Sequence, residues 1–367
     1  MTSDRRFMAM ALALGRRGLG KVWPNPAVGC VIVRDGIVVG RGWTQPGGRP
    51  HAEPVALAQA GGAARGATVY VTLEPCAHHG KTPPCAEALV AAGVARVVAA
   101  LRDPDPRVDG GGLARLRAAG IAVETGLMEA EARRANAGFL SRIQCGRPQL
   151  TLKLASSFDG RIATATGESQ WITGPEARRM VHAQRARHDA VLVGGGTARV
   201  DDPSLTVRGL GLARQPTRVI ASAPLDLPVD SKLFRELDVA PVWICHGPDA
   251  PPDRRERWRN RGARLFEVPT GPDNALDPVA MFQALGGAGL TRVYCEGGGR
   301  LAGSVLAAGL VDDLVAFSAG LGLGADGLPG LGALGLTSLD RAPRFVLDRV
   351  QQVGPDVMAL WRAAGAA

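Results

Sequence analysis

Short apolar runs alternate with amphipathic segments along the first 126 residues of the chain. The pattern predicts strands where the runs are short and helices where apolar residues recur every three or four positions. Asp35-Gly36 lies between the first two runs and is typical of a hairpin turn. Alternation of strands and helices favours a sheet with helices on its faces. We predict strands at 27–33, 36–43, 67–73, 94–101 and 121–126, and helices at 52–60, 85–93 and 112–120.

A second series of apolar runs begins after Arg147-Pro148, and we place a domain boundary there, giving domains 1–146 and 147–367. A new strand is expected from Gln149, and Gly174-Pro175 precedes a predicted helix at 176–188. Further short runs follow, separated by helical or loop segments: AVLVGGGT, TRVIAS, PVWICH, RLFEVP and RVYCEGGG. These indicate a second α/β domain. A chain of 367 residues is also too long for one ordinary core.

The N-terminus combines basic residues with an apolar stretch, as a signal peptide does. The stretch is short, however, and Asp4 stands at its start. We favour an amphipathic first helix in which Ser3 is the cap. No apolar run has the length of a membrane span, so we expect a cytoplasmic protein without a membrane partner. The residues expected to face a core are Phe7, Met8, Ala11, Leu12 and Leu14.

The chain is basic, with a formal net charge of +9. Its arginines are scattered, which favours a coding preference for Arg, although small anionic substrates would also suit a positive charge. A nucleic-acid-binding protein would need clustered basic and aromatic residues around its site. Near the candidate metal site described below, only Arg49, Trp43, Tyr70 and Lys81 are of these types. We therefore expect no nucleic-acid partner.

The six cysteines are spread thinly, so a disulfide framework is not expected. Cys76 and Cys85 lie together in a polar segment rich in Pro and Gly, TLEPCAHHGKTPPC. The other cysteines lie in apolar surroundings and are expected to be small core residues. These are Cys30, Cys145, Cys245 and Cys295.

His51 and Glu53 lie just before a predicted helix, and Pro75-Cys76 and Cys85 lie between a strand and the next helix. One imidazole and two thiolates with a free fourth position make up a catalytic rather than a structural zinc site. Zinc activates a bound water, and Glu53 can accept and return its proton. The order H-x-E…P-C-x-x-C is typical of zinc deaminases, although here the cysteines are further apart. The alternative is a buried histidine with two inert cysteines.

Two glycine clusters follow predicted strands of the second half, at 194–196 and 297–299. Neither has the G-x-G-x-x-G spacing of a dinucleotide fold. Glycine still lets backbone N–H groups approach a phosphate at a helix N-terminus, here a helix expected from about Leu301. The alternative is tight packing of a strand against a helix.

The chain resembles the bifunctional deaminase/reductases of riboflavin biosynthesis. The resemblance rests on PNPAVGCVIV, HAE and TLEPCAHHGKTPPC, and then on KLASSFDGRIA, GESQWITG, DDPSLTVR and EGGGRLAGSVL. It implies a cytidine-deaminase-like α/β/α sandwich followed by a dihydrofolate-reductase-like α/β domain. It also implies deamination of a diaminopyrimidinone that carries a ribosylamino 5′-phosphate, and then NADPH-dependent reduction of the ribosyl group to ribityl.

For the first half, the resemblance implies that His51, Cys76 and Cys85 are the zinc ligands and Glu53 the proton shuttle. It implies pyrimidine binding by Asn25, whose alternative role is that of a turn residue between prolines. Further candidates contact the substrate phosphate: Lys81 and Thr82, joined by His78 or His79 unless these only cap the loop. Relatives commonly have histidine at the position of Val55, so a substrate contact from there is in doubt.

For the second half, the resemblance implies an NADPH site and a substrate site. Arginines suit a phosphate because they donate as a fork, but Arg185 and Arg208 can equally be solvated surface charges, and Trp171 can be plain core. Asp201 is a weak candidate for the proton donor. The cofactor residues are Ala155, Trp171, Thr197, Asp201, Gly298, Gly299, Arg300, Leu301, Ala302, Gly303 and Ser304; the substrate residues are Ser169, Arg185, Leu205, Arg208 and Glu296.

The leading hypothesis is therefore a two-step enzyme that takes a small phosphorylated pyrimidine, uses Zn²⁺ and NADPH, and forms a homo-oligomer. The main alternative is a deaminase whose second domain no longer reduces. The full set of motifs in the second half argues against that alternative.

Overall fold

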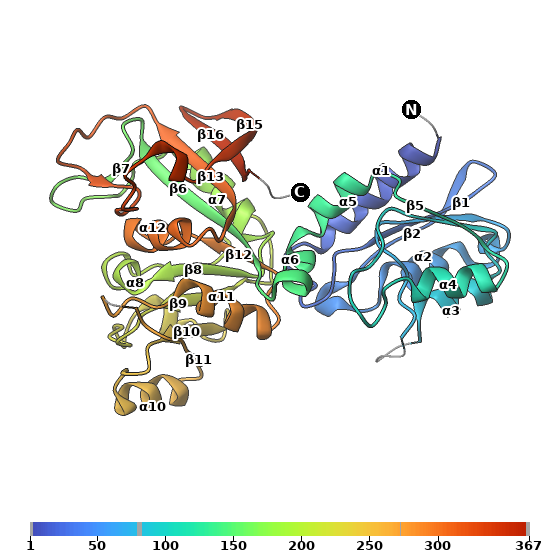
Figure 1. Cartoon of the computed structure of the whole chain (residues 1–367), viewed down its shortest axis with the longest axis horizontal. Helices are drawn as coiled ribbons and strands as arrows, with labels where there is room; N and C mark the ends of the chain where they lie inside the picture. Colours follow the sequence, from blue (N-terminus) through green and yellow to red (C-terminus); the bar gives the residue numbers. More distant parts are fainter. Residues whose placement is uncertain (1–2, 79–82, 272, 365–367) are drawn as a thin grey trace. The chain divides into compact units, whose positions relative to one another are not determined.

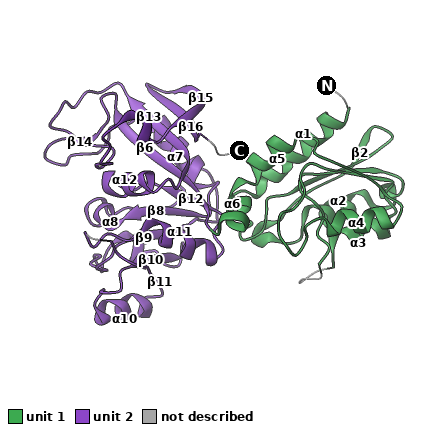
Figure 2. Cartoon of the chain, in the orientation of Figure 1, with its two compact units in different colours: residues 1–146 green, residues 147–367 purple. Residues whose placement is uncertain are grey.

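The computed structural model describes residues 3–78, 83–271 and 273–364. The chain divides into two compact units, residues 1–146 and residues 147–367 (Figure 2). Each unit has its own sheet, and each is described by itself below.

The first unit is built on a five-stranded sheet in the order β2-β1-β3-β4-β5. β1 is antiparallel to β2 and β3, while β3, β4 and β5 are parallel. The hairpin turn forms where it was predicted, with positive φ at both Asp35 and Gly36, as such a turn requires. The strands are β1 Gly29–Arg34, β2 Ile37–Trp43, β3 Thr68–Val71, β4 Arg96–Ala99 and β5 Ala122–Thr125.

Helices cover both faces of this sheet, α1 and α5 on one face and α2, α3 and α4 on the other (Figure 1). The predicted first helix exists, and the five apolar residues assigned to its inner face are all buried. Two helices were not anticipated, α5 and α6, which follow the last strand. The helices are α1 Ser3–Gly15, α2 Ala52–Ala60, α3 Cys85–Ala92, α4 Gly111–Ala118, α5 Glu129–Ala135 and α6 Ala137–Cys145.

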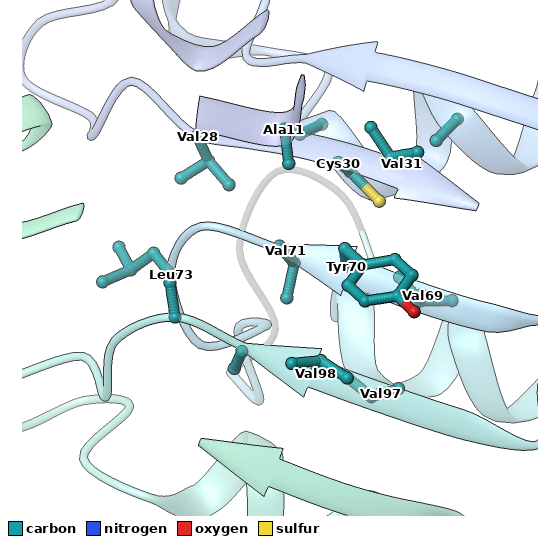
Figure 3. Close-up of a cluster of buried hydrophobic side chains, with 14 of the residues drawn as sticks. Ala11, Val28, Cys30, Val31, Val69, Tyr70, Val71, Leu73, Val97 and Val98 are labelled. Atoms are coloured by element: carbon teal, nitrogen blue, oxygen red, sulfur yellow. The ribbon is translucent and has the colours of Figure 1, made fainter. Parts of the chain in front are cut away.

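Aliphatic residues of the central strands form the core of this unit (Figure 3). α2 lies very close to β2 because that strand presents Gly40 and Gly42. A Cβ atom on Gly42 would lie 2.1 Å from the carbonyl oxygen of Ala52, and one on Gly40 would lie 2.3 Å from that of Ala56. Neither space admits a side chain, so these glycines fix the position of α2.

The second unit contains a nine-stranded sheet in the order β11-β10-β9-β8-β12-β6-β13-β16-β15. It is parallel from β11 to β13, and β16 and β15 add an antiparallel hairpin at one edge. The six strands expected from sequence all form. They are β6 Gln149–Ser157, β8 Ala190–Gly194, β9 Thr217–Ala221, β10 Val242–His246, β11 Arg264–Glu267 and β12 Arg292–Cys295.

The C-terminal strands were not predicted: β13 Val311–Ala319, β15 Phe345–Val353 and β16 Asp356–Ala363. Two short strands, β7 Arg161–Ala163 and β14 Leu328–Pro329, pair with each other. The last major helix begins at Gly299, two residues before the expected start. The helices are α7 Pro175–Arg185, α8 Gly195–Asp201, α9 Lys232–Arg235, α10 Pro252–Asn260, α11 Pro278–Gly287 and α12 Gly299–Ala307.

Cys30, Cys245 and Cys295 are buried, as expected of core cysteines, but Cys145 is exposed. That expectation was wrong because Cys145 is the last residue of α6, where the helix leaves its apolar contacts. Among the described residues, no helix has both the length and the apolar character needed to cross a membrane.

Candidate functional site

His51 occupies the N-cap position of α2, with φ −69° and ψ 170°. Glu53 lies in the first turn of that helix and is buried, only 3% exposed. Side chains two positions apart in a continuous helix point away from each other. Because His51 has an extended backbone, its side chain is not bound by helix geometry and can lie near that of Glu53. This agrees with the prediction that the two residues lie at the start of a helix.

Cys76 and Cys85 meet His51 although eight residues lie between the two cysteines along the chain. The Nδ1 atom of His51 lies 3.7 Å from Sγ of Cys76 and 3.4 Å from Sγ of Cys85. Cys85 is the first residue of α3, and its backbone N–H donates to Sγ of Cys76 at 3.3 Å. Both thiols are free.

These three residues fit a zinc ion. Their ligand atoms all lie within 4.8 Å of one another. With Zn–S near 2.3 Å and Zn–N near 2.0 Å, tetrahedral ligands are separated by roughly 3.5–3.8 Å, which is close to the sulfur–nitrogen distances here. Among the described residues no fourth His, Cys, Asp or Glu joins the group. The set therefore matches a catalytic site with an open position.

The electrostatics of the group favour a metal. A hydrogen bond from the Cys85 side chain, assisted by His51, lowers the pKa of Cys76 to about 4. The same hydrogen bond, together with burial, raises the pKa of Cys85. A bound Zn²⁺ displaces the proton from a coordinating thiol. Burial raises the pKa of Glu53, and His51 partly opposes this; a raised pKa suits a carboxyl group that exchanges a proton near neutral pH.

A cavity of about 210 Å³ opens beside these residues, and His51, Cys76 and Glu53 are part of its lining. Asn25 also lines it, and its Nδ2 donates to the carbonyl of Gly48 at 3.1 Å. The amide oxygen of Asn25 is not used in that bond. The cavity thus combines two members of the metal-binding set, His51 and Cys76, with a carboxyl group and an amide.

Other candidates of the first half lie elsewhere. Lys81, Thr82 and His79 are outside the described residues. His78 does line the cavity. Val55 does not line it in this structure, and instead lies against Gly42 of β2.

Sequence reasoning missed the loop after β4, which forms a wall of the cavity with Asp103, Asp105, Arg107 and Val108. Asp103 and Asp105 are buried. Burial raises the pKa of Asp103 to about 6, whereas hydrogen bonds from Arg107 lower that of Asp105. The sequence signal was available, since Asp103 and Asp105 alternate with prolines in a loop that follows a buried strand, and such loops often carry binding residues.

In the second unit, Arg185 and Glu296 form a buried pair. Nε of Arg185 lies 2.5 Å and its Nη2 3.1 Å from the two oxygens of Glu296, and Nη1 donates to the carbonyl of Thr206 at 2.8 Å. The alternative of a solvated surface charge is wrong for Arg185, because its side chain is only 11% exposed. Arg208 is exposed, and no side-chain partner is found for it among the described residues.

The two glycine clusters come together. The backbone N–H of Gly298, the N-cap of α12, donates to Oγ1 of Thr197 at 3.2 Å. The first turn of α12 leaves N–H groups without helical partners, as every helix does. Thr197, Gly298 and the start of α12, Gly299–Ser304, therefore form a surface suited to an anionic group.

The remaining candidates of the second unit are spread around this region. Trp171 is 67% exposed and stacks on the Arg178 guanidinium at 4.6 Å, so it is not plain core. Leu205 is buried with φ +54°, an unusual backbone for leucine that is common at functional sites. Ala155 lies on β6, Ser169 precedes α7, and Asp201 ends α8.

Lys153 of β6 was not singled out from sequence. Burial lowers its pKa, and the charges of Glu296 and Asp201 act on it in the opposite direction. Lys153 is half-buried by its accessible surface, and it is a further charged group of this region.

Comparison with known proteins matches both halves. Residues 1–101 match the cytidine and deoxycytidylate deaminase zinc-binding region, and residues 148–359 match the RibD C-terminal domain. The riboflavin biosynthesis protein RibD of Escherichia coli is 46% identical over 365 residues, covering 96% of this chain and 98% of that protein.

Solved structures agree. RibD of Acinetobacter baumannii is 39% identical, with a TM-score of 0.89 and 99% of both chains covered. A diaminohydroxyphosphoribosylaminopyrimidine deaminase/5-amino-6-(5-phosphoribosylamino)uracil reductase of Thermotoga maritima is 33% identical, with a TM-score of 0.85 and 99% of both chains covered.

Replacing Cys85 by Ser should lower the zinc affinity by more than the roughly 10- to 100-fold that loss of an outer-shell partner costs. The physical reason is that the hydroxyl is a poorer ligand than the thiolate. Elemental analysis of the purified protein measures the zinc-to-protein ratio. Cys145→Ser, at an exposed cysteine, is the matched control. An unchanged ratio in the Cys85→Ser variant excludes Cys85 as a ligand.

Proposed function

The chain belongs to the family of bifunctional deaminase/reductases of riboflavin biosynthesis, and from this we propose its two reactions and the residues that carry them. The first unit deaminates 2,5-diamino-6-ribosylamino-4(3H)-pyrimidinone 5′-phosphate. The second unit reduces the ribosyl group with NADPH, giving 5-amino-6-ribitylamino-uracil 5′-phosphate. The observation that carries the proposal is the meeting of His51, Cys76 and Cys85, at the edge of a cavity that buried Glu53 also lines.

In the proposed deamination, His51, Cys76 and Cys85 hold Zn²⁺, which when bound supplies an activated water. Glu53 accepts the proton of the attacking water at its carboxylate and returns it to the leaving ammonia. Its burial favours this exchange, since the raised pKa brings the carboxyl group closer to neutral pH. The Asn25 amide lies in the same cavity and orients the pyrimidine by donating and accepting hydrogen bonds.

In the proposed reduction, bound NADPH would provide the hydride for C1′ of the open, imine-like ribosylamine. The ring oxygen released on opening would take its proton from solvent, from the substrate's own groups or from Asp201. Thr197, Gly298 and the first turn of α12 bind the cofactor phosphates. Because the fork of Arg185 is occupied by Glu296 and Thr206, Arg208 is the better of the two arginines for the substrate phosphate. The buried Arg185–Glu296 pair orders the substrate side of the site.

The alternative is a deaminase without reductase activity. The two hypotheses are separated by supplying the diaminopyrimidine phosphate with and without NADPH, and by following ammonia and NADPH separately. We expect ammonia in both cases and NADPH consumption that depends on prior deamination. Ammonia without any NADPH consumption would support the alternative. A nucleic-acid function would instead require binding that weakens steeply with salt.

Glu53→Gln should reduce ammonia release by about 10²- to 10⁴-fold, because the amide cannot carry the proton. The zinc-to-protein ratio should stay unchanged, since Glu53 is not part of the ligand group. Reduction of the already deaminated substrate should also be unaffected. Retained ammonia release would remove Glu53 from this role.

Arg208→Ala should raise the KM of reduction by about tenfold or more, the effect of losing a charge-assisted hydrogen bond, and should leave deamination unchanged. Steady-state kinetics of each step measures this. Arg259→Ala, at an exposed arginine on α10, is the matched control. Equal loss in both steps would contradict the assignment of the two reactions to separate units.

We also propose a homo-oligomer. β15 is the edge strand of the large sheet, and Val346 and Val350 on it are 62% and 54% exposed. Exposed apolar side chains on an edge strand favour pairing with another chain. Sedimentation analysis of the intact protein measures the mass, and a monomer at micromolar concentration would contradict the proposal. A cytoplasmic location remains a prediction, in keeping with metal-binding thiols that must stay reduced.

A further inference from the structure

Glu74 is a buried carboxylate in the middle of the metal-binding segment, two residues before Cys76. It is only 4% exposed. Among the described residues, the hydrogen bonds to its carboxylate all come from backbone N–H groups of two stretches of chain. Oε2 accepts from Asp103 at 3.3 Å and from Gly110 at 3.1 Å. Oε1 accepts from Gly112 at 3.0 Å and from Leu113 at 3.3 Å.

These donors lie at the two ends of one loop. Asp103 opens the loop after β4, Gly110 closes it, and Gly112 and Leu113 belong to the first turn of α4. One side chain thus joins the start and the end of the loop to the segment that carries Cys76. A buried carboxylate that accepts several N–H bonds is fixed firmly, because each donor would otherwise be left unsatisfied.

The same junction is closely packed. A Cβ atom on Gly112 would lie 1.8 Å from the carbonyl oxygen of Pro75, the residue between Glu74 and Cys76. The start of α4 therefore touches the backbone of the metal-binding segment directly. The backbone N–H of Glu74 also donates to the carbonyl of Leu101 at 2.9 Å. The geometry leaves the loop little freedom relative to Cys76.

Between its anchored ends, the loop forms the acidic wall of the cavity. Asp103, Asp105, Arg107 and Val108 all line the cavity. The wall holds its own shape, since Asp103 accepts from the backbone N–H of Asp105 at 2.9 Å, and Asp105 accepts from that of Arg107 at 3.0 Å. These local bonds shape the loop but do not attach it to the metal-binding segment. Glu74 provides that attachment through its side chain.

We propose that Glu74 is a positioning residue that sets the distance between the metal-binding segment and the acidic wall, residues 103–108, and so determines how tightly the pyrimidine is held. The proposal rests on the proposed deamination. Within the wall the Asp105 carboxylate is paired with Arg107. Among the described residues Asp103 accepts only from the backbone N–H of Asp105, through Oδ1. Its second oxygen suits the N–H donors of a pyrimidinone that carries amino groups. The wall contributes no member of the ligand group, so its displacement changes substrate binding more than the proton exchange at Glu53.

Glu74→Gln tests this with almost no change of volume. The amide retains one acceptor oxygen, but its NH₂ group faces two of the backbone N–H donors. We expect the KM of deamination to rise about tenfold or more, with kcat within about threefold of the wild-type value, which is the pattern of lost uniform binding. The zinc-to-protein ratio should not change. Amide hydrogen exchange at Asp103, Gly110, Gly112 and Leu113 should become faster, a readout that does not depend on activity.

Glu87→Gln is the matched control, because it removes one carboxylate of the same unit that pairs with Arg115 at a partly exposed site on α3. Glu74→Asp keeps both acceptor oxygens on a shorter side chain and should restore part of the substrate affinity. If Glu74→Gln does not fold, Glu74→Asp is measured in its place. A wild-type KM together with wild-type amide exchange in Glu74→Asp would then overturn the proposal.

Two further outcomes would also overturn it. One is a wild-type KM in Glu74→Gln. The other is loss of zinc and kcat with KM unchanged, which would assign Glu74 to the metal-binding segment alone. Failure of the proposed function is distinguishable from both, because the wild-type protein would then release no ammonia from the diaminopyrimidine phosphate.

Discussion

The candidate site of the first unit depends on the close contact between α2 and β2. Gly40 and Gly42 let the backbone of the helix rest on the strand, at a distance that no side chain would permit. This contact fixes the helix start, where His51 has an extended backbone and Glu53 lies in the first turn. The imidazole then reaches the two sulfurs while the carboxyl group remains buried beside the cavity. The candidate metal ligand His51 and the candidate proton carrier Glu53 are thus positioned by the same contact between α2 and β2.

Much of this arrangement was predictable from local sequence. The hairpin at Asp35-Gly36 follows from turn chemistry, and the first helix from its apolar positions. The metal set followed from residue types: a histidine and two cysteines at the ends of expected elements, together with a nearby carboxylate. The structure brings these residues together without requiring any of them to leave its predicted element. Local rules carry far here because His51, Glu53 and Cys85 lie at the start of a helix, while Cys76 lies in the loop between β3 and α3.

Long-range partners could not be predicted in the same way. Nothing near Arg185 indicates that its guanidinium pairs with Glu296, which is 111 residues further along the chain. The loop of Asp103 and Asp105 has no hydrophobic period, and its place in the cavity depends on hydrogen bonds to Glu74. The C-terminal strands were not predicted for a related reason. β15 has mostly exposed residues and mixes charged with apolar side chains, so its sequence lacks a buried-strand pattern.

The strand order of the two sheets has a consequence for synthesis on the ribosome. The first unit has all its strands once residue 125 has emerged. In the second unit, β6 comes first in the chain but pairs with β12 and β13, whose residues begin at 292 and 311. β6 ends at residue 157, so it must wait for about 135 residues of further translation before β12 begins at residue 292. At about 5–20 residues per second this takes on the order of ten seconds. During that interval the unpaired edges of β6 are exposed to other nascent chains, whereas the first unit can already complete its sheet.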